Sequence, residues 1–386
     1  MFELVDDTIQ NVVIKVIGVG GGGGNAVEHM VSRNIDGVEF ISANTDIQAL
    51  QRLTCETQLQ LGSSITRGLG AGANPVVGKE SAIEDRDRIA KTIQGADMLF
   101  ITAGMGGGTG TGAAPVVAEV ARELGILTVA VVTKPFVHEG RKRMQIAETG
   151  IAEISEHVDS LITIPNERLL TVMDKDTPLE DAWAAVDDVL LRAVQGISDL
   201  IIRPGKINVD FADVKTVMGE MGMAMMGSGT ASGENRVREA TEFAVKSPLL
   251  ENIDLKGAKG ILVNIAAGEN ISLGEYAAVL EEIQDLASED ATQVIGTVIN
   301  PEMGEELRVS VVATGLRVSD EMEKAHTLTK EVKKKVAGDG PIDYTDFDKP
   351  TIMRNQVIQG GVEGEVPGGK ELEYLDIPAF LRRQAD

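Results

Sequence analysis

Two glycine-rich segments, at residues 19–25 and 104–112, stand out in the first third of this chain. Each follows an apolar, strand-like run and precedes a helix-like one, and residues 106–112 read Gly-Gly-Gly-Thr-Gly-Thr-Gly. An ordinary turn needs fewer glycines. Glycine lets successive backbone N–H groups face one side and lets a ligand approach closely, and a helix N-terminus adds positive potential. The two segments therefore predict loops that bind a polyphosphate.

A second interpretation of the first segment is a dinucleotide-binding loop. Gly18, Gly20 and Gly23 match the spacing Gly-x-Gly-x-x-Gly after a strand-like run, and Glu39 or Asp46 could hold a ribose. This alternative predicts a nicotinamide-dependent dehydrogenase, but it leaves residues 104–112 unexplained. The common nucleotide-hydrolase loop that ends in Gly-Lys-Ser/Thr does not occur in the sequence, so backbone N–H groups rather than a loop lysine would face the phosphates.

The composition restricts partners and compartment. The formal charge of −24, from 36 basic and 60 acidic residues, disfavours direct binding to nucleic acid or anionic lipid. A single cysteine precludes an intrachain disulfide and fits a reducing compartment, with an inert thiol as the expected role. The acidic start is unlike a secretion signal, and no apolar run reaches transmembrane length. We therefore expect a cytoplasmic protein without direct membrane insertion.

Short β-branched runs alternate with helix-like stretches in a first domain expected at residues 12–176, after a flexible N-terminus at 1–11. The strand-like runs lie at 12–19, 38–43, 98–103, 128–133 and 160–165. Such alternation is typical of an α/β fold with a parallel sheet. Ligands of these sheets bind at the carboxyl ends of the strands, which is where both glycine-rich segments fall. The two segments can therefore meet at one ligand.

A long central helix is expected at residues 177–204, with Thr177 as N-cap, Pro178 in the first helical position and Glu180 completing a capping box. At 1.5 Å per residue it would span roughly 35 to 40 Å and join the first domain to the next. Mixed helical and strand patterns predict a smaller α+β domain at 205–316, in which the Met-rich piece at 218–226 is read as core or contact surface.

The C-terminal part of the chain has a different character. Residues 317–370 are polar and predict a flexible linker. The most polar part, residues 330–369, would have a root-mean-square end-to-end distance of about 35 Å as a coil. An apolar cluster at 371–386 follows this tether. Such a cluster is typical of a short peptide that docks onto partner proteins.

Several motifs together resemble the FtsZ family of the tubulin superfamily. These are residues 106–112 with the first glycine segment, and residues 44–46, 68–75, 134–136, 139–143, 208–213 and 375–383. They cover nearly the whole chain in the family's order. The resemblance implies a tubulin-like GTPase domain with a parallel sheet, a long central helix and a second, smaller α+β domain. It also implies that the polyphosphate is GTP or GDP.

Candidate nucleotide-binding residues come from the glycine segments and from motifs that match the family. Those placed around the phosphates are Gly21, Gly22, Gly23, Gly24, Asn25, Gly107, Gly108, Thr109 and Gly110. By resemblance, Ala71 and Gly72 sense the terminal phosphate, and Glu139 and Arg143 contact ribose and phosphate. The resemblance further assigns to the nucleotide site Asn44, Thr133, Pro135, Asn166 and Asp187, the last two at the guanine base.

Trp183 lies one helical turn before Asp187, so it would offer the base a stacking surface, although an ordinary core aromatic is an equal alternative. Because phosphate charge needs further compensation, we expect Mg²⁺ at the site. A contribution from K⁺ is left open, and no metal ligand is assigned.

Asp210 and Asp213, with Asn208, are the candidate catalytic residues. Paired carboxylates near a terminal phosphate would hold a cation or accept a proton from water. They belong at the far end of the long helix, and if the glycine segments lie at its other end, a single chain cannot bring the two together. The alternative is that the two aspartates are helix-cap residues, which explains their residue type but not their pairing. By resemblance, the acidic loop of one subunit completes the site of the next, and hydrolysis is coupled to a head-to-tail homopolymer.

The resemblance finally implies a cellular role. The chain would form the division ring at mid-cell, and residues 375–383, from Leu375 to Arg383, would bind division proteins such as FtsA, ZipA and MinC. A tubulin-like filament for plasmid segregation is the alternative within the superfamily. The apolar C-terminal peptide argues against it, because that peptide is similar to the adaptor-binding segment of the division proteins.

Overall fold

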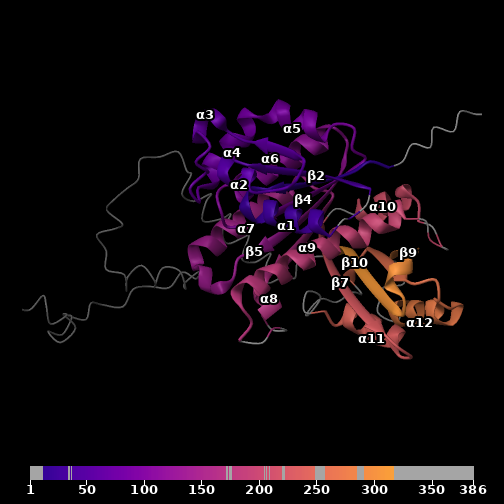
Figure 1. The fold of residues 1–386 in the computed structure, drawn as a ribbon. Coiled ribbons are helices and arrows are strands. Elements are labelled where there is room, and N and C mark those ends of the chain that lie inside the picture. Colours follow the sequence, from indigo (N-terminus) through magenta and orange to yellow (C-terminus); the bar gives the residue numbers. More distant parts are fainter. Residues whose placement is uncertain are drawn as a thin grey trace, which may run out of the picture. The chain divides into compact units, whose positions relative to one another are not determined.

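The computed structural model describes most of the chain up to residue 316 (Figure 1). The described residues are 12–33, 35, 37–170, 173, 176–203, 205, 207, 209–219, 222–247, 257–284 and 291–316. The expected N-terminus, linker and docking peptide, and Asn208 among the candidate site residues, therefore lie outside them. No helix among the described residues combines the length and the apolar character needed to cross a membrane.

Six parallel strands form the first half of the sheet. They are β1 (Ile14–Val19), β2 (Val38–Asn44), β3 (Thr57–Gln60), β4 (Met98–Gly104), β5 (Leu127–Lys134) and β6 (Ser160–Pro165), in the order β3-β2-β1-β4-β5-β6. The centre of this half is β1, where Ile14 pairs in register with Val38 on one side and Met98 on the other. This confirms the expected α/β fold with a parallel sheet.

Helices cover both faces of these strands. They are α1 (Gly20–Ser32), α2 (Ile47–Gln51), α3 (Ser63–Thr66), α4 (Pro75–Glu84), α5 (Arg86–Ile93), α6 (Thr109–Glu123), α7 (Arg141–Ser155) and α8 (Asn166–Leu170). The strands supply apolar side chains to both faces, with period two. Val16 and Phe100 belong to the core beneath α1 and the long helix α9 (Leu179–Ile202), whereas Ile17 and Ile101 belong to the core on the opposite face.

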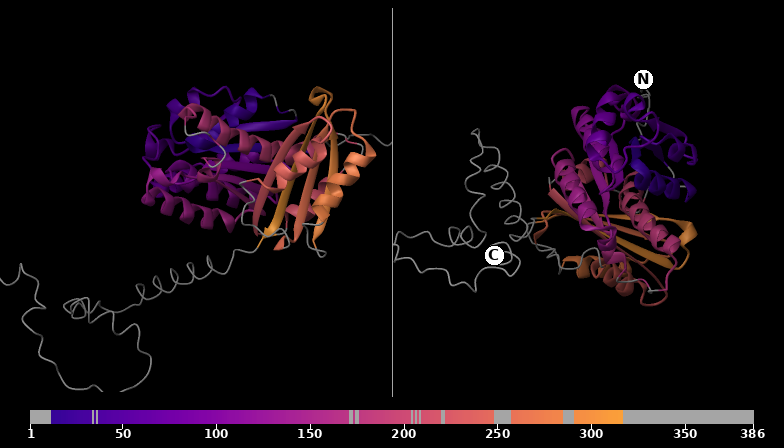
Figure 2. Two further views of the ribbon diagram at one scale, coloured as in Figure 1. Left: turned by 90° about the horizontal axis from the view of Figure 1, so that it is seen from below. Right: turned by 90° about the vertical axis from the view of Figure 1, so that its left-hand side faces the viewer.

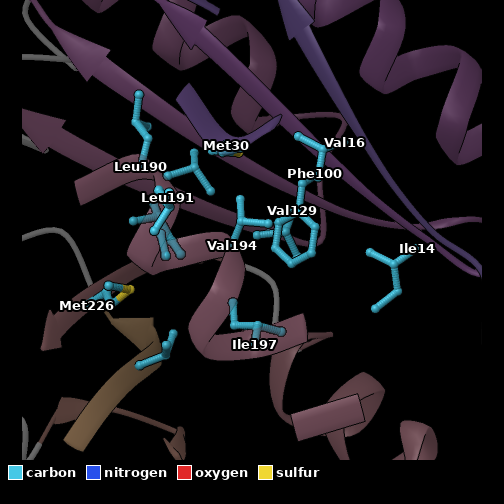
Figure 3. Close-up of a cluster of buried hydrophobic side chains, with 14 of the residues drawn as sticks. Ile14, Val16, Met30, Phe100, Val129, Leu190, Leu191, Val194, Ile197 and Met226 are labelled. Atoms are coloured by element: carbon cyan, nitrogen blue, oxygen red, sulfur yellow. The ribbon is translucent and has the colours of Figure 1, made fainter. Parts of the chain in front are cut away.

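The long helix α9 carries the apolar stripe that its sequence predicts. Leu190, Leu191, Val194 and Ile197 are buried against the sheet, and Figure 3 shows them with side chains from β1, β4 and β5. The beginning of the helix differs from the expected capping box. Pro178 is the N-cap residue and no side chain caps the helix, so Thr177 lies one residue too early for that role.

The second half of the sheet has mixed direction. It contains β7 (Gly222–Ser232), β8 (Gly260–Ala267), β9 (Thr292–Ile299) and β10 (Glu306–Leu316), and its helices are α10 (Phe211–Met218), α11 (Arg236–Val245) and α12 (Leu273–Gln284). Strand β10 pairs antiparallel with β7 and β8, and β8 pairs parallel with β9. Helices α9 and α10 contact one face and α11 the other, with α12 packed beside α11 (Figures 1 and 2).

The two halves are joined edge to edge, because β6 and β7 pair in parallel from Ser160↔Gly222 to Ile162↔Ala224. All ten described strands consequently form a single sheet. The Met-rich piece contributes to this junction as part of β7, which the sequence did not predict as a strand. Met226 is buried in the core beside α9, and Figure 3 shows it near the end of that core.

Candidate functional site

A cavity of about 790 Å³ opens at the carboxyl ends of the central strands, between α1, α6 and the first half of α9. Its size suits a nucleotide. It is lined by Gly21, Gly22, Asn25, Gly104, Met105, Gly107, Gly108, Thr109, Gly110, Thr133, Pro135, Glu139, Arg143, Asn166, Glu180, Trp183, Val186, Asp187 and Leu190. Residues from both glycine segments, which are about eighty positions apart in the sequence, therefore meet at one site.

The first turns of α1 and α6 form one end of the cavity. A Cβ added to Gly21 or to Gly107 would meet no atom within 4 Å, so the backbone at both positions faces open space. The N-termini of α1 and α6 converge there, which is an arrangement suited to phosphate oxygens. The first glycine segment is not a separate loop, because α1 already begins at Gly20. Residues 105–108 of the second segment do form a short loop between β4 and α6.

Gly23 and Gly24 do not line the cavity. Gly23 lies on the side of α1 that faces the sheet, where a Cβ would collide with the backbone of Thr102 and Gly18. Gly24 is also buried, and its Cβ position lies 3.2 Å from a methyl group of Leu53. Glycine at these two positions permits close packing of the helix on the strands. The sequence alone does not separate these glycines from their exposed neighbours.

The loop before α4 lies beside Gly108, at the end of the cavity that the starts of α1 and α6 form. A Cβ on Gly108 would stand 2.9 Å from the Cβ of Ala71, and Ala71 is buried, whereas Gly72 is exposed with φ of 60°. Neither residue lines the cavity. Asn44 is likewise outside the lining, buried at the end of β2, where its side-chain oxygen accepts a hydrogen bond of 3.2 Å from the Asp46 N–H.

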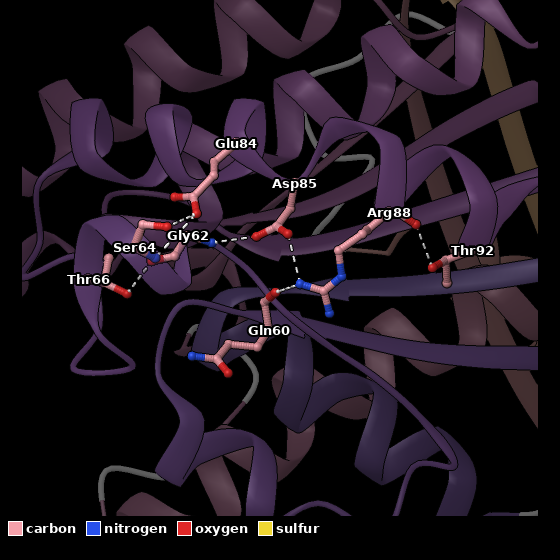
Figure 4. A network of polar contacts seen from close by, with 8 residues as sticks. All are labelled: Gln60, Gly62, Ser64, Thr66, Glu84, Asp85, Arg88 and Thr92. Carbon is pink, nitrogen blue, oxygen red and sulfur yellow. Dashed lines mark hydrogen bonds and ion pairs between the residues drawn. The ribbon is translucent and has the colours of Figure 1, made fainter.

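A polar network holds α3, the short helix that precedes this loop (Figure 4). The Asp85 carboxylate accepts hydrogen bonds from the Gly62 N–H at 2.8 Å and from the Arg88 guanidinium at 2.7 Å. The Ser64 hydroxyl donates to Glu84 at 2.5 Å. These contacts tie the start of α3 to α4 and to the first turn of α5.

The opposite end of the cavity offers groups that suit a flat, polar ligand. The side-chain oxygen of Asn166 is buried and has no hydrogen-bond partner among the described residues. Trp183 is 42% exposed and meets Phe136 edge to face with ring centroids 5.3 Å apart. An orphaned buried acceptor calls for a donor from a ligand, and an exposed indole can stack on a ring. This exposure excludes the core-aromatic alternative for Trp183.

Asp187 is the carboxylate at this end. Burial raises the pKa of Asp187 to about 6, and the nearby His29 opposes this rise. Its neighbour Asp188 faces Arg192, whose Nη2 lies 2.7 Å from Oδ2. Burial alone would raise the pKa of Asp188, but Arg192 and His29 together lower it. Two adjacent acids on α9 thus have opposite pKa shifts.

The remaining candidate residues line the middle of the cavity. The Arg143 Nε lies 3.2 Å from Glu139 Oε2, and Glu139 Oε1 accepts a hydrogen bond of 2.8 Å from the Phe136 N–H. The buried Thr133 lies at the end of β5, where its carbonyl accepts from the Met105 N–H at 3.0 Å. Arg143 and Glu139 therefore present one cation and one acid to a ligand.

Asp210 and Asp213 are remote from the cavity. Leu190 is the last residue of α9 in the cavity lining, and the helix continues for twelve more residues, or about 18 Å, before α10 begins beyond its far end. Figure 1 shows α8 and α10 at opposite ends of α9. Asp210 caps α10 by accepting a hydrogen bond of 2.8 Å from the Asp213 N–H, and both side chains are exposed.

Five lining residues were not expected from the sequence. They are Gly104, Met105, Glu180, Val186 and Leu190. Helical spacing offered a signal for two of them, Glu180 and Leu190, because positions 180, 183, 187 and 190 fall on one face of α9. Gly104 is the last residue of β4 and Met105 follows it, and both residues open the second glycine-rich segment.

Two other features bear on the chemistry. Among the described residues, no group of three or more His, Cys, Asp or Glu side chains is arranged to hold a metal ion. Cys55 is buried and burial raises the pKa of its thiol, as expected for an inert cysteine.

Two family descriptions match this chain. "Tubulin/FtsZ family, GTPase domain" matches residues 13–174, and "FtsZ family, C-terminal domain" matches residues 222–317. The "Cell division protein FtsZ" of Azotobacter vinelandii is 60% identical over 394 residues, with all of both chains covered. The protein of the same name from Coxiella burnetii is 61% identical over 384 residues, with 99% of each chain covered.

Solved structures agree with these matches. An empty FtsZ dimer from M. jannaschii has a TM-score of 0.76 at 42% identity, covering 80% of this chain and 89% of that chain. The nicotinamide and plasmid-segregation alternatives are not favoured by these relatives. The chain belongs to the FtsZ family, the cell-division GTPases of the tubulin superfamily.

Proposed function

We propose that each subunit binds GTP in the cavity at the strand ends and hydrolyses it only when Asp210 and Asp213 of an adjacent copy reach the terminal phosphate. The observation that carries this proposal is the separation along α9: the cavity ends at Leu190, and the two exposed aspartates follow the far end of the helix. A head-to-tail contact brings the two ends together and repeats indefinitely, so it produces a filament.

The phosphates lie against the helix N-termini in this proposal. Backbone N–H groups of Gly21, Gly22, Gly107 and Gly108 face the negative oxygens, and Thr109 and Gly110 extend the same surface. The convergence of two helix ends on open space supports this assignment. Asn25 lines the cavity on α1. Gly23 and Gly24 serve packing, and Ala71 and Gly72 act by holding the loop against Gly108 rather than by lining the cavity.

The guanine base lies at the Asn166 end. Its carbonyl and N–H groups need both a donor and acceptors, and the unpaired Asn166 oxygen together with the Asp187 carboxylate supplies acceptors. Trp183 stacks against the ring, while Glu139 and Arg143, flanked by Thr133 and Pro135, contact the ribose and the phosphates. A carboxylate accepts two N–H donors only in its ionised form.

Hydrolysis follows from the second subunit's acids. Water attacks the terminal phosphorus of GTP, the bond from that phosphorus to the β–γ bridging oxygen breaks, and GDP and inorganic phosphate are the products. The Asp213 carboxylate orients the water or accepts its proton, and the glycine N–H groups stabilise the charge on the phosphate oxygens. Asp210 has a structural part in this, because its side chain fixes the first turn of α10 that carries Asp213. We include Asn208 in the same loop on the strength of the family resemblance.

We propose that Mg²⁺ binds together with GTP in the cavity. A further contribution from K⁺ is left open. Mg²⁺ binds mainly to substrate phosphates with few protein ligands, and it offsets the phosphate charge. The absence of a three-residue metal cluster among the described residues is compatible with that mode. Arg143 and the glycine N–H groups are the groups of this chain that would share the same task.

We also propose that the filament forms the division ring at mid-cell in the cytoplasm. Residues 375–383, from Leu375 to Arg383, would then dock onto partners such as FtsA, ZipA and MinC. The support for this part is the resemblance of that peptide and the names of the full-length relatives. Loss of partner binding on deletion of residues 375–383, with unchanged GTP turnover, is the expected result.

The test is GTP turnover per molecule measured across a range of protein concentrations. Turnover should rise with concentration and reach a plateau, because the complete site exists only in contacts between subunits. Asp213→Ala should keep the wild-type affinity for GTP and lower turnover by about 100-fold or more. Asp87→Ala is the matched control, since it removes an exposed first-turn aspartate from another eight-residue helix, α5.

Mixing two inactive variants sharpens this test. Asp213→Ala retains an intact cavity, and Thr109→Arg retains an intact acidic loop. If the sites are shared, the mixture should recover part of the lost turnover where a normal cavity meets a normal loop. Full activity of a dilute, monomeric wild-type sample would overturn the proposal.

A further inference from the structure

Phe136 is a buried aromatic residue beside the cavity, and the proposed function gives it no role. It is 4% exposed, belongs to the core beneath α9 and does not line the cavity. Its ring meets that of Trp183 edge to face, with centroids 5.3 Å apart and 78° between the ring planes. The imidazole of His138 stacks on it with centroids 5.2 Å apart and 15° between the planes. Phe136 therefore contacts both other rings, and one of them, Trp183, lines the cavity.

Two carboxylates hold the backbone that carries Phe136. The Phe136 N–H donates a hydrogen bond of 2.8 Å to Glu139 Oε1, and the N–H of the next residue, Val137, donates one of 3.1 Å to Glu167 Oε2. Glu139 lines the cavity, and Glu167 lies on α8 directly after Asn166, which also lines it. The backbone at positions 136 and 137 is therefore fixed by contacts that do not involve Trp183.

Trp183 itself has few restraints. It lies near the start of α9 and is 42% exposed. Among the residues that the structure describes, Phe136 provides its only ring contact, and no group forms a hydrogen bond with its indole N–H. An exposed side chain changes rotamer freely, and fixing it when a ligand binds costs conformational entropy. An edge-to-face aromatic contact stabilises one orientation in advance, and so reduces that cost.

We propose that Phe136 is a positioning residue for base stacking: its ring holds the Trp183 indole in the orientation that stacks on guanine before the nucleotide enters. The inference rests on the proposed function, because it requires Trp183 to meet the base. Phe136 itself touches no ligand and acts through the indole. The same short segment carries Pro135 and Glu139, which line the cavity, so it aligns the ribose contacts and the stacking surface together.

The first test measures the GDP affinity of the full-length protein in a double-mutant cycle. GDP is used because it is not hydrolysed during the titration. Phe136→Leu should bind GDP about fivefold more weakly than the wild type, and Trp183→Leu about tenfold more weakly. The double variant should match Trp183→Leu within about twofold, because Phe136 has no effect once the indole is absent.

The second test follows the indole directly. Trp183 is the only tryptophan in the sequence, so tryptophan fluorescence reports on this side chain alone. Exposed side chains change rotamer within picoseconds to nanoseconds, a range that fluorescence anisotropy detects. In the nucleotide-free protein, Phe136→Leu should lower the anisotropy of Trp183. Saturating GDP should remove most of the difference from the wild type, because the base then holds the indole.

Two further variants serve as controls. Phe40→Leu makes the same substitution on β2, at the edge of the same buried cluster and outside the cavity lining, and it should leave GDP affinity and anisotropy unchanged. Phe136→Tyr keeps a ring, so it should recover most of the affinity that Phe136→Leu loses. Thermal unfolding establishes that each variant is folded. If Phe136→Leu does not fold, Phe136→Ile takes its place, because a β-branched residue suits the extended backbone at this position.

Several outcomes would overturn the inference. Additive losses in the double variant, or an unchanged anisotropy of Trp183 in Phe136→Leu, would mean that Phe136 has only a packing role. A folded Phe136→Tyr that binds as weakly as Phe136→Leu would also contradict it. If Trp183→Leu binds GDP like the wild type, the proposed base contact itself is wrong. If Trp183→Leu binds weakly and a folded Phe136→Leu does not, only this inference fails.

Discussion

The hydroxyl groups of Thr45 and Thr109 lie 2.6 Å apart and share a buried hydrogen bond. Thr45 follows β2, and Thr109 is the first residue of α6 and lines the cavity. The carbonyl of Thr45 also accepts a hydrogen bond of 3.2 Å from the Thr66 hydroxyl. The first turn of α6 is therefore anchored to the residue that follows β2 and, through it, to the last residue of α3.

Replacing Thr45 by valine leaves the buried Thr109 hydroxyl without its hydrogen-bond partner. We expect the free energy of unfolding to fall by about 1–3 kcal/mol, and GDP affinity to fall as well because Thr109 loses its fixed orientation. Denaturant unfolding and GDP titration measure the two effects. Thr92→Val is the control, because the Thr92 hydroxyl bonds only to the Arg88 carbonyl of its own helix. Equal unfolding midpoints for the two variants would contradict the expectation.

The glycines near the cavity should respond differently to alanine. Gly107→Ala places its Cβ in open space within the cavity, so the protein should fold normally and bind GDP about tenfold more weakly. Gly112→Ala places its Cβ against the backbone of Pro75 and Lys79, so it should destabilise the packing of α6 on α4 by several kcal/mol. Thermal unfolding separates these cases. A normal unfolding temperature for Gly112→Ala would show that the two helices can move apart freely.

The raised pKa of Asp187 makes the free energy of unfolding depend on pH. Because the pKa of Asp187 is raised from 3.8 to about 6 on folding, its contribution to the free energy of unfolding is fully present below about pH 4 and is lost as pH rises through 6. The loss should not exceed about 3 kcal/mol. Asp187→Asn removes this slope in the nucleotide-free protein. Parallel stability curves for the two proteins between pH 4 and pH 7 would contradict the prediction.

The second half of the sheet depends on a buried ion pair. Arg236 is 5% exposed and its Nε lies 2.7 Å from Glu275 Oε1. The hydrogen bond from Arg236 lowers the pKa of Glu275 from 4.5 to about 2. Glu275 therefore stabilises the fold above about pH 4.5, and this contribution is lost as pH falls toward 2.

Glu275→Gln should lower the free energy of unfolding by about 3 kcal/mol at neutral pH, because it leaves a buried guanidinium without its anion. Glu281→Gln, on the same helix α12, is the control for loss of an acidic charge. Denaturant unfolding at pH 7 and at pH 3 measures the effect. The difference between Glu275→Gln and wild type should be smaller at the lower pH.

The first half of the fold followed closely from the sequence because its strands are β-branched runs that are buried on both faces. The exceptions have physical reasons. Strand β3 is four residues long and only Leu59 in it is buried, so its pattern is weak. Strand β7 is rich in glycine, methionine and serine, and pairing with β10 rather than local preference makes it a strand.

The site was predictable to the extent that residue type decides geometry. Both glycine segments, Asn166 and Asp187 are indeed gathered around one cavity. Sequence could not separate Gly21, which faces open space, from Gly23, which touches a strand, because the two differ only in which side of α1 they occupy. Nor could it indicate that burial and His29 act in opposite directions on Asp187, since both depend on how α1 packs against α9.

The short ladder between β6 and β7 gives this molecule a mechanical weak line. Three residue pairs hold that seam, fewer than in any other ladder between the described strands. A force that pulls the two halves of the sheet apart would break those few hydrogen bonds first. Helix α9 packs beside strands of both halves, so it would continue to hold them together. Under tension the protein would yield there before either half unravels.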